Sequence, residues 1–166
     1  MKKMAHALIA LLLAAPMLAQ DGYKFYRLDF VLKELDENKV VSQKTYSTSM
    51  STDERQKGAI RSGTKVPYQG APGTYNYVDV GVNIDCQKIQ EVNGQLMVQV
   101  SADISSVPAP SGVAGESAVP GVPVVRQNRW NSVALVAIGK ATTLFSSDDL
   151  NTKRKLQLEL TATPIK

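Results

Sequence analysis

The sequence has few of the side chains on which most enzymes and metal sites depend. Its 166 residues include a single histidine, His6, and a single cysteine, Cys86. Imidazole is the commonest side chain for moving protons and binding metals near neutral pH. No serine lies in a Gly-x-Ser-x-Gly motif, and no phosphate-binding loop is present. We therefore predict a protein that is not an enzyme and has no catalytic residue, no metal and no cofactor.

Long hydrophobic runs are also scarce, and the longest lies at the N-terminus. Residues 1–19 contain two lysines, a mainly apolar run from Ala5 to Ala15 and small residues up to Ala19. This order is typical of a secretory signal peptide cleaved after Ala19, and the run is shorter than the roughly 20 residues of a membrane-spanning helix. A short uncleaved anchor is the alternative. We expect export to the periplasm or outer membrane of a Gram-negative-type bacterium, and cleavage would remove His6.

Neither sign of charge is in large excess. The chain has 19 Lys and Arg against 15 Asp and Glu, and loss of Lys2 and Lys3 with the signal peptide leaves 17 against 15. The basic residues are dispersed except at 153–155, and few aromatic residues lie among them. We therefore expect no nucleic-acid partner.

What the sequence does contain is a long alternating stretch from Tyr75 to Ser106. Apolar residues occupy every second position on both sides of Asn93-Gly94. A period of two places alternate side chains on opposite faces of an extended backbone, and Asn-Gly favours the positive φ angles of a tight turn. The stretch is predicted to be a β-hairpin with one packed face. Cys86 lies on that face, so we interpret it as a buried hydrophobic residue; an intermolecular disulfide is the alternative.

Strand patterns continue on both sides of this hairpin. The continuous apolar run Val133 to Ile138 predicts a strand buried on both faces, whereas 53–58 is a charged connection with at most one helical turn. We count about seven strands and no firm helix, which predicts an all-β fold of antiparallel strands in a sandwich-like or open-barrel arrangement. The predicted strands outside the hairpin are Tyr23–Leu35, Val40–Ser51, Ala59–Tyr68, Asn128–Ile138, Ala141–Ser146 and Leu156–Ala162.

Proline and the acidic pairs mark three further features. Pro67 closes its strand, and a proline without an N–H predicts a strand at a sheet edge. The segment 107–123 is rich in proline and glycine, which predicts an exposed loop long enough to be functional. The acidic pairs Asp36-Glu37 and Asp148-Asp149 lie in predicted turns, where acids are usually solvated; a hydrolase using Asp148 and Asp149 is the alternative.

Several segments, taken together and in order, resemble the core of the bacterial secretins, the outer-membrane channel proteins of type II and type III secretion and of type IV pilus systems. In the upstream segment a glycine precedes Val-Pro-Tyr, and the last segment includes Thr-Pro. The resemblance covers roughly residues 60–165. The matching segments are Ile60–Tyr68, Tyr77–Ile84, Gly94–Val100, Asp103–Val107, Arg126–Arg129, Val133–Lys140 and Leu156–Ile165.

The resemblance implies an outer-membrane-associated β-domain that assembles side by side into a ring with a gated barrel for folded protein or a pilus. It places the strand around Arg61 to Tyr68 near the gate and the loop 107–123 where the family has a membrane-facing lip. The candidate edge or gate residues are Arg61, Thr64, Val66, Pro67 and Tyr68. The candidate lip or binding-loop residues are Val107, Pro108, Pro110, Pro120, Pro123 and Trp130.

These observations lead to one leading hypothesis and one alternative. We divide the chain into a signal peptide (1–19), an N-terminal hairpin with its charged connection (20–58) and a secretin-like β-domain (59–166). The leading hypothesis is an exported, non-enzymatic domain that associates through sheet edges with itself or with a secretion or pilus-type envelope complex, in protein transport across the outer membrane. The edge candidates are the Pro67 strand and Tyr23–Leu35. The alternative is a monomeric periplasmic binding module that holds its ligand with Trp130 and the loop 107–123.

Overall fold

The computed structural model describes residues 22–70, 73–107, 123–148 and 154–165, and in them the chain is all-β. It forms two antiparallel sheets of four strands each, so the described strands number eight rather than about seven. The predicted fold class is confirmed. The described residues contain no helix that could cross a membrane.

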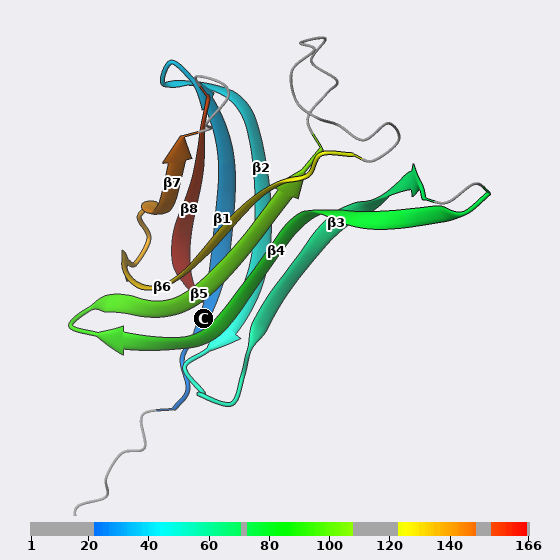
Figure 1. The fold of residues 1–166 in the computed structure, drawn as a ribbon. Coiled ribbons are helices and arrows are strands. Elements are labelled where there is room, and N and C mark those ends of the chain that lie inside the picture. The colour runs from blue at the N-terminus through cyan, green and yellow to red at the C-terminus, as the bar shows by residue number, and fades with distance from the viewer. Residues whose placement is uncertain (1–21, 71–72, 108–122, 149–153, 166) are drawn as a thin grey trace, which may run out of the picture.

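The chain contributes its first two and last two strands to one sheet and its middle four strands to the other (Figure 1). Sheet A has the order β2-β1-β8-β7, and sheet B has the order β3-β4-β5-β6. The strands of sheet A are β1 (Phe25–Asp36), β2 (Lys39–Ser51), β7 (Thr142–Asp148) and β8 (Arg154–Ile165). Those of sheet B are β3 (Gly58–Gln69), β4 (Tyr75–Val92), β5 (Gln95–Ser106) and β6 (Arg126–Ala137).

Local sequence explains the turns of this fold. Asn93 and Gly94 have φ angles of 50° and 74°, as the predicted Asn-Gly hairpin turn requires. Glu37 and Asn38, between β1 and β2, also have positive φ angles. The connection 53–58 contains a hydrogen-bonded turn, with Gln56 N–H donating to Asp53 C=O, and no helix.

One face of each sheet packs against the other, and the alternating apolar rows meet there in a single core. Cys86 is part of this core, as predicted, and burial raises the pKa of its thiol to about 12. Such a thiol is not reactive at neutral pH. The largest buried side chains are those of Leu28, Phe30, Met50, Ile84, Ile89, Leu96, Leu158 and Leu160.

The N-terminal strand is not a sheet edge, contrary to expectation. β1 pairs with β2 on one side and along its full length with β8 on the other. The predicted edge Tyr23–Leu35 is therefore wrong, because the C-terminal strand returns to cover it. The segments 20–58 and 59–166 consequently share sheet A.

The apolar run on β6 is not buried on both faces either. Val136 is fully buried, but Val133 and Leu135 expose 55% and 54% of their surface. β6 is the last strand of its sheet, and no described element covers its outward face. Two aliphatic side chains are thus left on the surface of sheet B.

A polar cluster ties the start of sheet A to the turn end of sheet B. The Glu91 carboxylate accepts hydrogen bonds from Lys24 Nζ at 2.7 Å and from the Tyr26 hydroxyl at 3.0 Å. These two donors hold the pKa of Glu91 below its usual range. Burial, together with the bond to Glu91, raises the pKa of Tyr26.

We expect Glu91→Gln to destabilise the protein at neutral pH and to have a smaller effect in acid. A carboxyl group whose folded pKa is lowered stabilises the fold above its unfolded pKa and loses that effect as the pH falls through the folded pKa. Urea unfolding of both proteins at pH 7 and pH 3 measures the difference. An equal destabilisation at the two pH values would contradict the role assigned to the Glu91 charge.

Candidate functional site: the open edges and the arm

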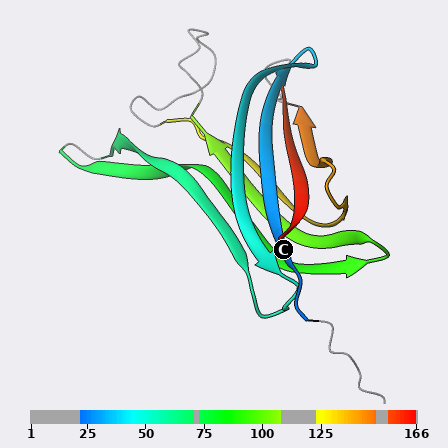
Figure 2. The same ribbon diagram turned by 180° about the vertical axis from the view of Figure 1, so that it is seen from behind.

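Each sheet ends in strands with one unpaired side. Within the described residues these strands are β2 and β7 in sheet A and β3 and β6 in sheet B. β2 and β3 are consecutive and contact each other on one side of the molecule, whereas β6 contacts β7 on the other (Figures 1 and 2). The molecule therefore presents two open edges on one side and two on the opposite side.

The far end of the β3–β4 hairpin projects beyond the rest of the molecule (Figure 1). We call this part, Thr64–Gln69 with Tyr75–Val80, the arm. β4 pairs with β5 only from Val82 onward, so the arm consists of two strands alone. A two-stranded ribbon is marginally stable in water. The arm therefore has the character of a segment that needs a partner.

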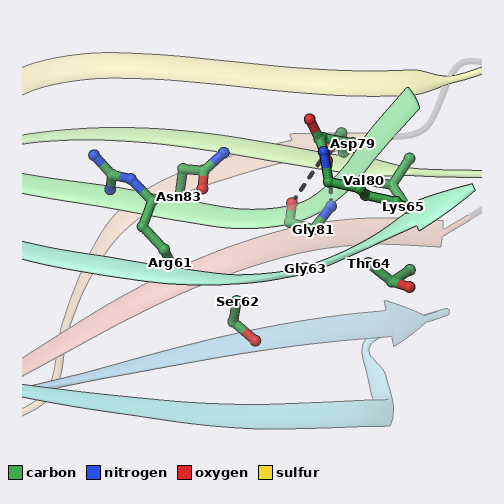
Figure 3. A pocket seen from close by; sticks show the side chains of 10 residues that line it. Arg61, Ser62, Gly63, Thr64, Lys65, Asp79, Val80, Gly81 and Asn83 are labelled. Carbon is green, nitrogen blue, oxygen red and sulfur yellow. Dashed lines mark hydrogen bonds and ion pairs between the residues drawn. The ribbon is translucent and has the colours of Figure 1, made fainter. Parts of the chain in front are cut away.

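Two glycines face each other where the arm begins. Gly63 pairs with Gly81, and Gly81 has a φ angle of 152°. A Cβ on Gly63 would approach Val80 C=O to 2.6 Å, and one on Gly81 would approach Ser62 C=O to 2.2 Å. The strands bend here and need this close backbone approach. Without side chains the pair forms the floor of a hollow of about 470 Å³ flanked by Arg61 and Lys65 (Figure 3).

Ser105 on β5 occupies the point where β4 departs from β5. Gly81 N–H donates to Ser105 Oγ at 3.0 Å, and the Ser105 hydroxyl donates to Gly81 C=O at 3.5 Å. A side chain thus replaces the main-chain ladder at the base of the arm. Ser105 is a positioning residue for the arm.

We expect Ser105→Ala to loosen this base without unfolding the core. The Gly81 amide loses its acceptor, so its hydrogen exchange should accelerate by about tenfold, a free-energy change of about 1.4 kcal/mol. Ser101→Ala, on the same strand and face, is the matched control. Unchanged exchange at Gly81 would show that Ser105 does not hold the arm.

The same hydrogen bonds determine the direction of the main chain on β3. Because Gly81 N–H and C=O point to β5, the opposite residue Gly63 directs its own groups away from β4, to the open edge. Directions alternate along a strand, so Arg61, Lys65 and Pro67 also face the open edge. An N–H at position 67 would point to the open edge, where none of the described strands accepts it. Proline at this position therefore costs the monomer no hydrogen bond to those strands.

The outward face of sheet B carries charges that are paired within the sheet. Arg61 Nη2 lies 2.6 Å from Asp85 Oδ1, and Lys65 Nζ lies 3.4 Å from Asp79 Oδ1. Burial opposes ionisation of Asp103, but hydrogen bonds from Gln127 and Arg129 hold its pKa below the usual range. These pairs are solvent-exposed and each contributes little to stability.

The residues singled out from sequence do not all meet. Thr64, Val66, Pro67 and Tyr68 lie on the arm, and Arg61 lies just before it. Val107, Pro123 and Trp130 lie at or beside β5 and β6 on the far side of sheet B, and Trp130 is half-buried against the core. Pro108, Pro110 and Pro120 lie outside the described residues.

Two residues of the arm, Tyr75 and Tyr77, were not among the candidates predicted from sequence. They expose 67% and 62% of their surface and lie across the arm from Gln69 and Pro67. Alternation assigned them to the wet face of the hairpin, where large aromatic side chains are unusual. Two aromatic residues at exposed positions were therefore the signal in the sequence that could have identified this surface.

Two described acids of the predicted acidic pairs form exposed ion pairs. Asp148 is 81% exposed and pairs with Lys155, while Asp36 pairs with Arg154. Asp149 lies outside the described residues. No group of three potential metal ligands occurs in the described parts of the chain.

The described fold is that of a secretin-type β-domain. Superposition on a solved structure of the secretin InvG, from the Salmonella SPI-1 type III secretion injectisome, gives a TM-score of 0.50 at 12% identity. The match covers 87% of this chain and 64% of that one. A chain in an atomic model of the same injectisome's basal body proteins InvG, PrgH and PrgK gives the same TM-score and identity, with 87% and 45% covered.

A type II secretin, GspD of enteropathogenic Escherichia coli, is also similar, at a TM-score of 0.48 and 10% identity, with 87% and 67% of the two chains covered. No protein-family model and no curated protein matches the sequence. The likeness at this identity is one of fold. The chain spans less than two thirds of the length of the InvG chains it matches.

Proposed function

We propose that this protein is an exported, non-enzymatic β-domain that associates edge to edge with copies of itself. The observation that carries the proposal is the arrangement of open edges: β2 and β3 on one side, β6 and β7 on the other. One contact between two copies can then extend both sheets at once. Such contacts are heterologous, so they continue from copy to copy and close into a ring if the rotation permits.

The physical basis is main-chain hydrogen bonding at the sheet edges. Arg61, Gly63 and Lys65 direct their N–H and C=O groups to the open edge of β3, where a strand from another copy would satisfy them. An unpaired edge is otherwise a site of uncontrolled aggregation. The strand β6 runs antiparallel to β3, so a following copy continues the antiparallel pattern of sheet B.

The arm supports a second element of the proposal, the gate. It projects from the body as two strands, and it exposes Tyr75 and Tyr77 on the outward face while Val66 and Val78 are half-buried on the other. In an assembly each arm would gain apolar cover from neighbouring arms, which offsets its marginal stability. We propose that the arms close the opening of the assembled protein.

The setting proposed is a secretion or pilus-type envelope complex at the outer membrane, where the assembly serves protein transport. The secretin-type fold supports this setting, since the InvG chains that it matches belong to a type III secretion injectisome. One of the matched structures includes PrgH and PrgK beside InvG. Partners of this chain would accordingly be other copies and envelope components.

The test is the mass of the native protein extracted from the cell envelope in mild detergent, measured by size-exclusion chromatography with light scattering. A defined multimer in the outer-membrane fraction is the expected result. A monomer in the soluble periplasmic fraction would overturn self-association and favour the binding-module alternative. Conductance in planar bilayers then tests whether the multimer is a gated channel.

A further inference from the structure

The outward side chains of β3 and β6 restrict how these two edges can meet. On β3, Arg61 and Lys65 flank Gly63, and the strand has no acidic residue. β6 also has no acidic residue, and its outward cation is Arg129. The other half of its outward row, with Val133 and Leu135, is uncharged.

The directions of the main-chain N–H and C=O groups determine whether odd- or even-numbered residues of β3 and β6 pair. The main-chain N–H and C=O of Gly81 point to β5, so those of Asn83 do too. The main-chain groups of Asp103, the partner of Asn83, point back to β4. Arg129, opposite Asp103, therefore points away from β5, to the open edge of β6. Odd-numbered residues of β6 then face the edge as odd-numbered residues of β3 do. Pairing odd with odd also keeps both core-facing rows on one side of the sheet.

Two antiparallel registers of this parity pair all but one residue of each strand. In one, Arg129 lies directly opposite Lys65 of the other copy. Asp103 and Asp79 pair with these cations only in exposed, weak ion pairs, so the two like charges still disfavour this register. In the other, shifted by two residues, Arg129 lies opposite Pro67 and Asn131 lies opposite Lys65. Charge therefore selects the second register.

The selected register covers the two exposed aliphatic side chains. Val133 falls opposite Gly63, above the hollow formed by the glycine pair, and Leu135 falls beside the aliphatic part of Arg61. The hollow has room for a side chain that Gly63 and Gly81 lack, and Val133 is 55% exposed in the monomer. Burying such a side chain removes apolar surface from water and is therefore favourable.

From these constraints we infer that a second copy docks its β6 antiparallel along β3, with Asn131 opposite Lys65 and Val133 seated over the Gly63–Gly81 hollow. The inference rests on the proposed self-association. It adds the pair of edges used in sheet B and their register.

Disulfide trapping tests the register. Thr64→Cys and Ser132→Cys, which face each other in the selected register and leave Lys65 and Arg129 in place, are made as separate variants, mixed and oxidised. Antiparallel partners that are not hydrogen-bonded have Cα atoms about 4.5 Å apart, within disulfide range. The expected result is a covalent dimer that forms only in the mixture. Ser62→Cys mixed with Ser132→Cys is the matched control and reports the rejected register, again with Lys65 and Arg129 in place. Cys86 is retained because it is buried.

The outcomes separate this inference from the proposed function. Trapping of Ser132→Cys by Ser62→Cys instead of Thr64→Cys, a dimer from a single variant alone, or a multimer without any cross-link would each overturn the register while self-association stands. A protein that remains monomeric by light scattering before oxidation would overturn both.

A charge at the seat of Val133 gives a second test. Val133→Lys places a third cation between Arg61 and Lys65 of the next copy, so the concentration needed for half-assembly should rise at least about tenfold. Ile165→Lys is the control, since Ile165 is 46% exposed on an interior strand. Equal assembly of the two variants would overturn the inference.

Discussion

Lys65→Pro should convert the assembled protein into folded monomers. Lys65 directs its N–H to the open edge of β3, so proline removes a donor that only a neighbouring copy would use and places a ring in its path. The stability of the monomer should change by less than about 1 kcal/mol. Light scattering measures the mass, and urea unfolding measures the stability.

Two variants make this result specific. Lys65→Ala removes the same charge but keeps the N–H, so it should still assemble. Thr64→Pro, one residue earlier, removes an N–H directed at β4 and should lower the free energy of unfolding by about 1 kcal/mol or more. If Lys65→Pro formed the same multimer as the parent protein, β3 would not be an assembly edge.

Gly81→Ala should be among the most destabilising single-methyl changes in the chain. Its Cβ would lie 2.2 Å from Ser62 C=O and 2.4 Å from Gly63 Cα, at a φ angle of 152°. Both neighbours are backbone atoms and cannot rotate away. We expect the free energy of unfolding to fall by about 2 to 4 kcal/mol, measured by urea unfolding.

Variants at two other glycines separate the effect of the positive φ angle from the effect of the close backbone contact. Gly94→Ala tests positive φ alone, because no atom lies within 4 Å of its Cβ, and should cost about 1 to 2 kcal/mol. Gly22→Ala meets neither obstacle and should change stability by less than about 0.5 kcal/mol. A Gly81→Ala variant no less stable than Gly94→Ala would mean that the close approach of the strands is not required.

The elements set by neighbouring residues were predictable from sequence. Alternation and Asn93-Gly94 determine the central hairpin, and Cys86 lies on its packed face because of its position in that pattern. Pro67 does not end β3, which continues to Gln69, but the structure places β3 at the end of sheet B, as a proline inside a strand indicates.

The elements set by distant partners were not predictable in the same way. β1 is interior because residues 25–36 pair with residues 154–165, and nothing local in either strand specifies the other. Val133 and Leu135 belong to an apolar run like that of a buried strand, but they remain exposed because no described element covers the outward face of their strand.

The arm is an intermediate case. Alternation runs from Val78 to Cys86, across the point at Val82 where β4 begins to pair with β5, so periodicity does not reveal where that pairing ends. The unequal lengths on the two sides of Asn93-Gly94, and glycines at 63 and 81 inside strands, were signals that one strand continues alone. The exposed aromatic residues Tyr75 and Tyr77 were a third signal of this kind.

Because the molecule has different edges on its two opposite sides, a copy with one blocked side could stop the assembly of the others. A Lys65→Pro subunit keeps its β6–β7 side intact, so it can join a growing row at one end and accept nothing at its own blocked face. Small amounts co-expressed with the parent protein would shorten or open every assembly they enter. Because a closed ring tolerates no blocked face, such a variant would be dominant over the parent protein.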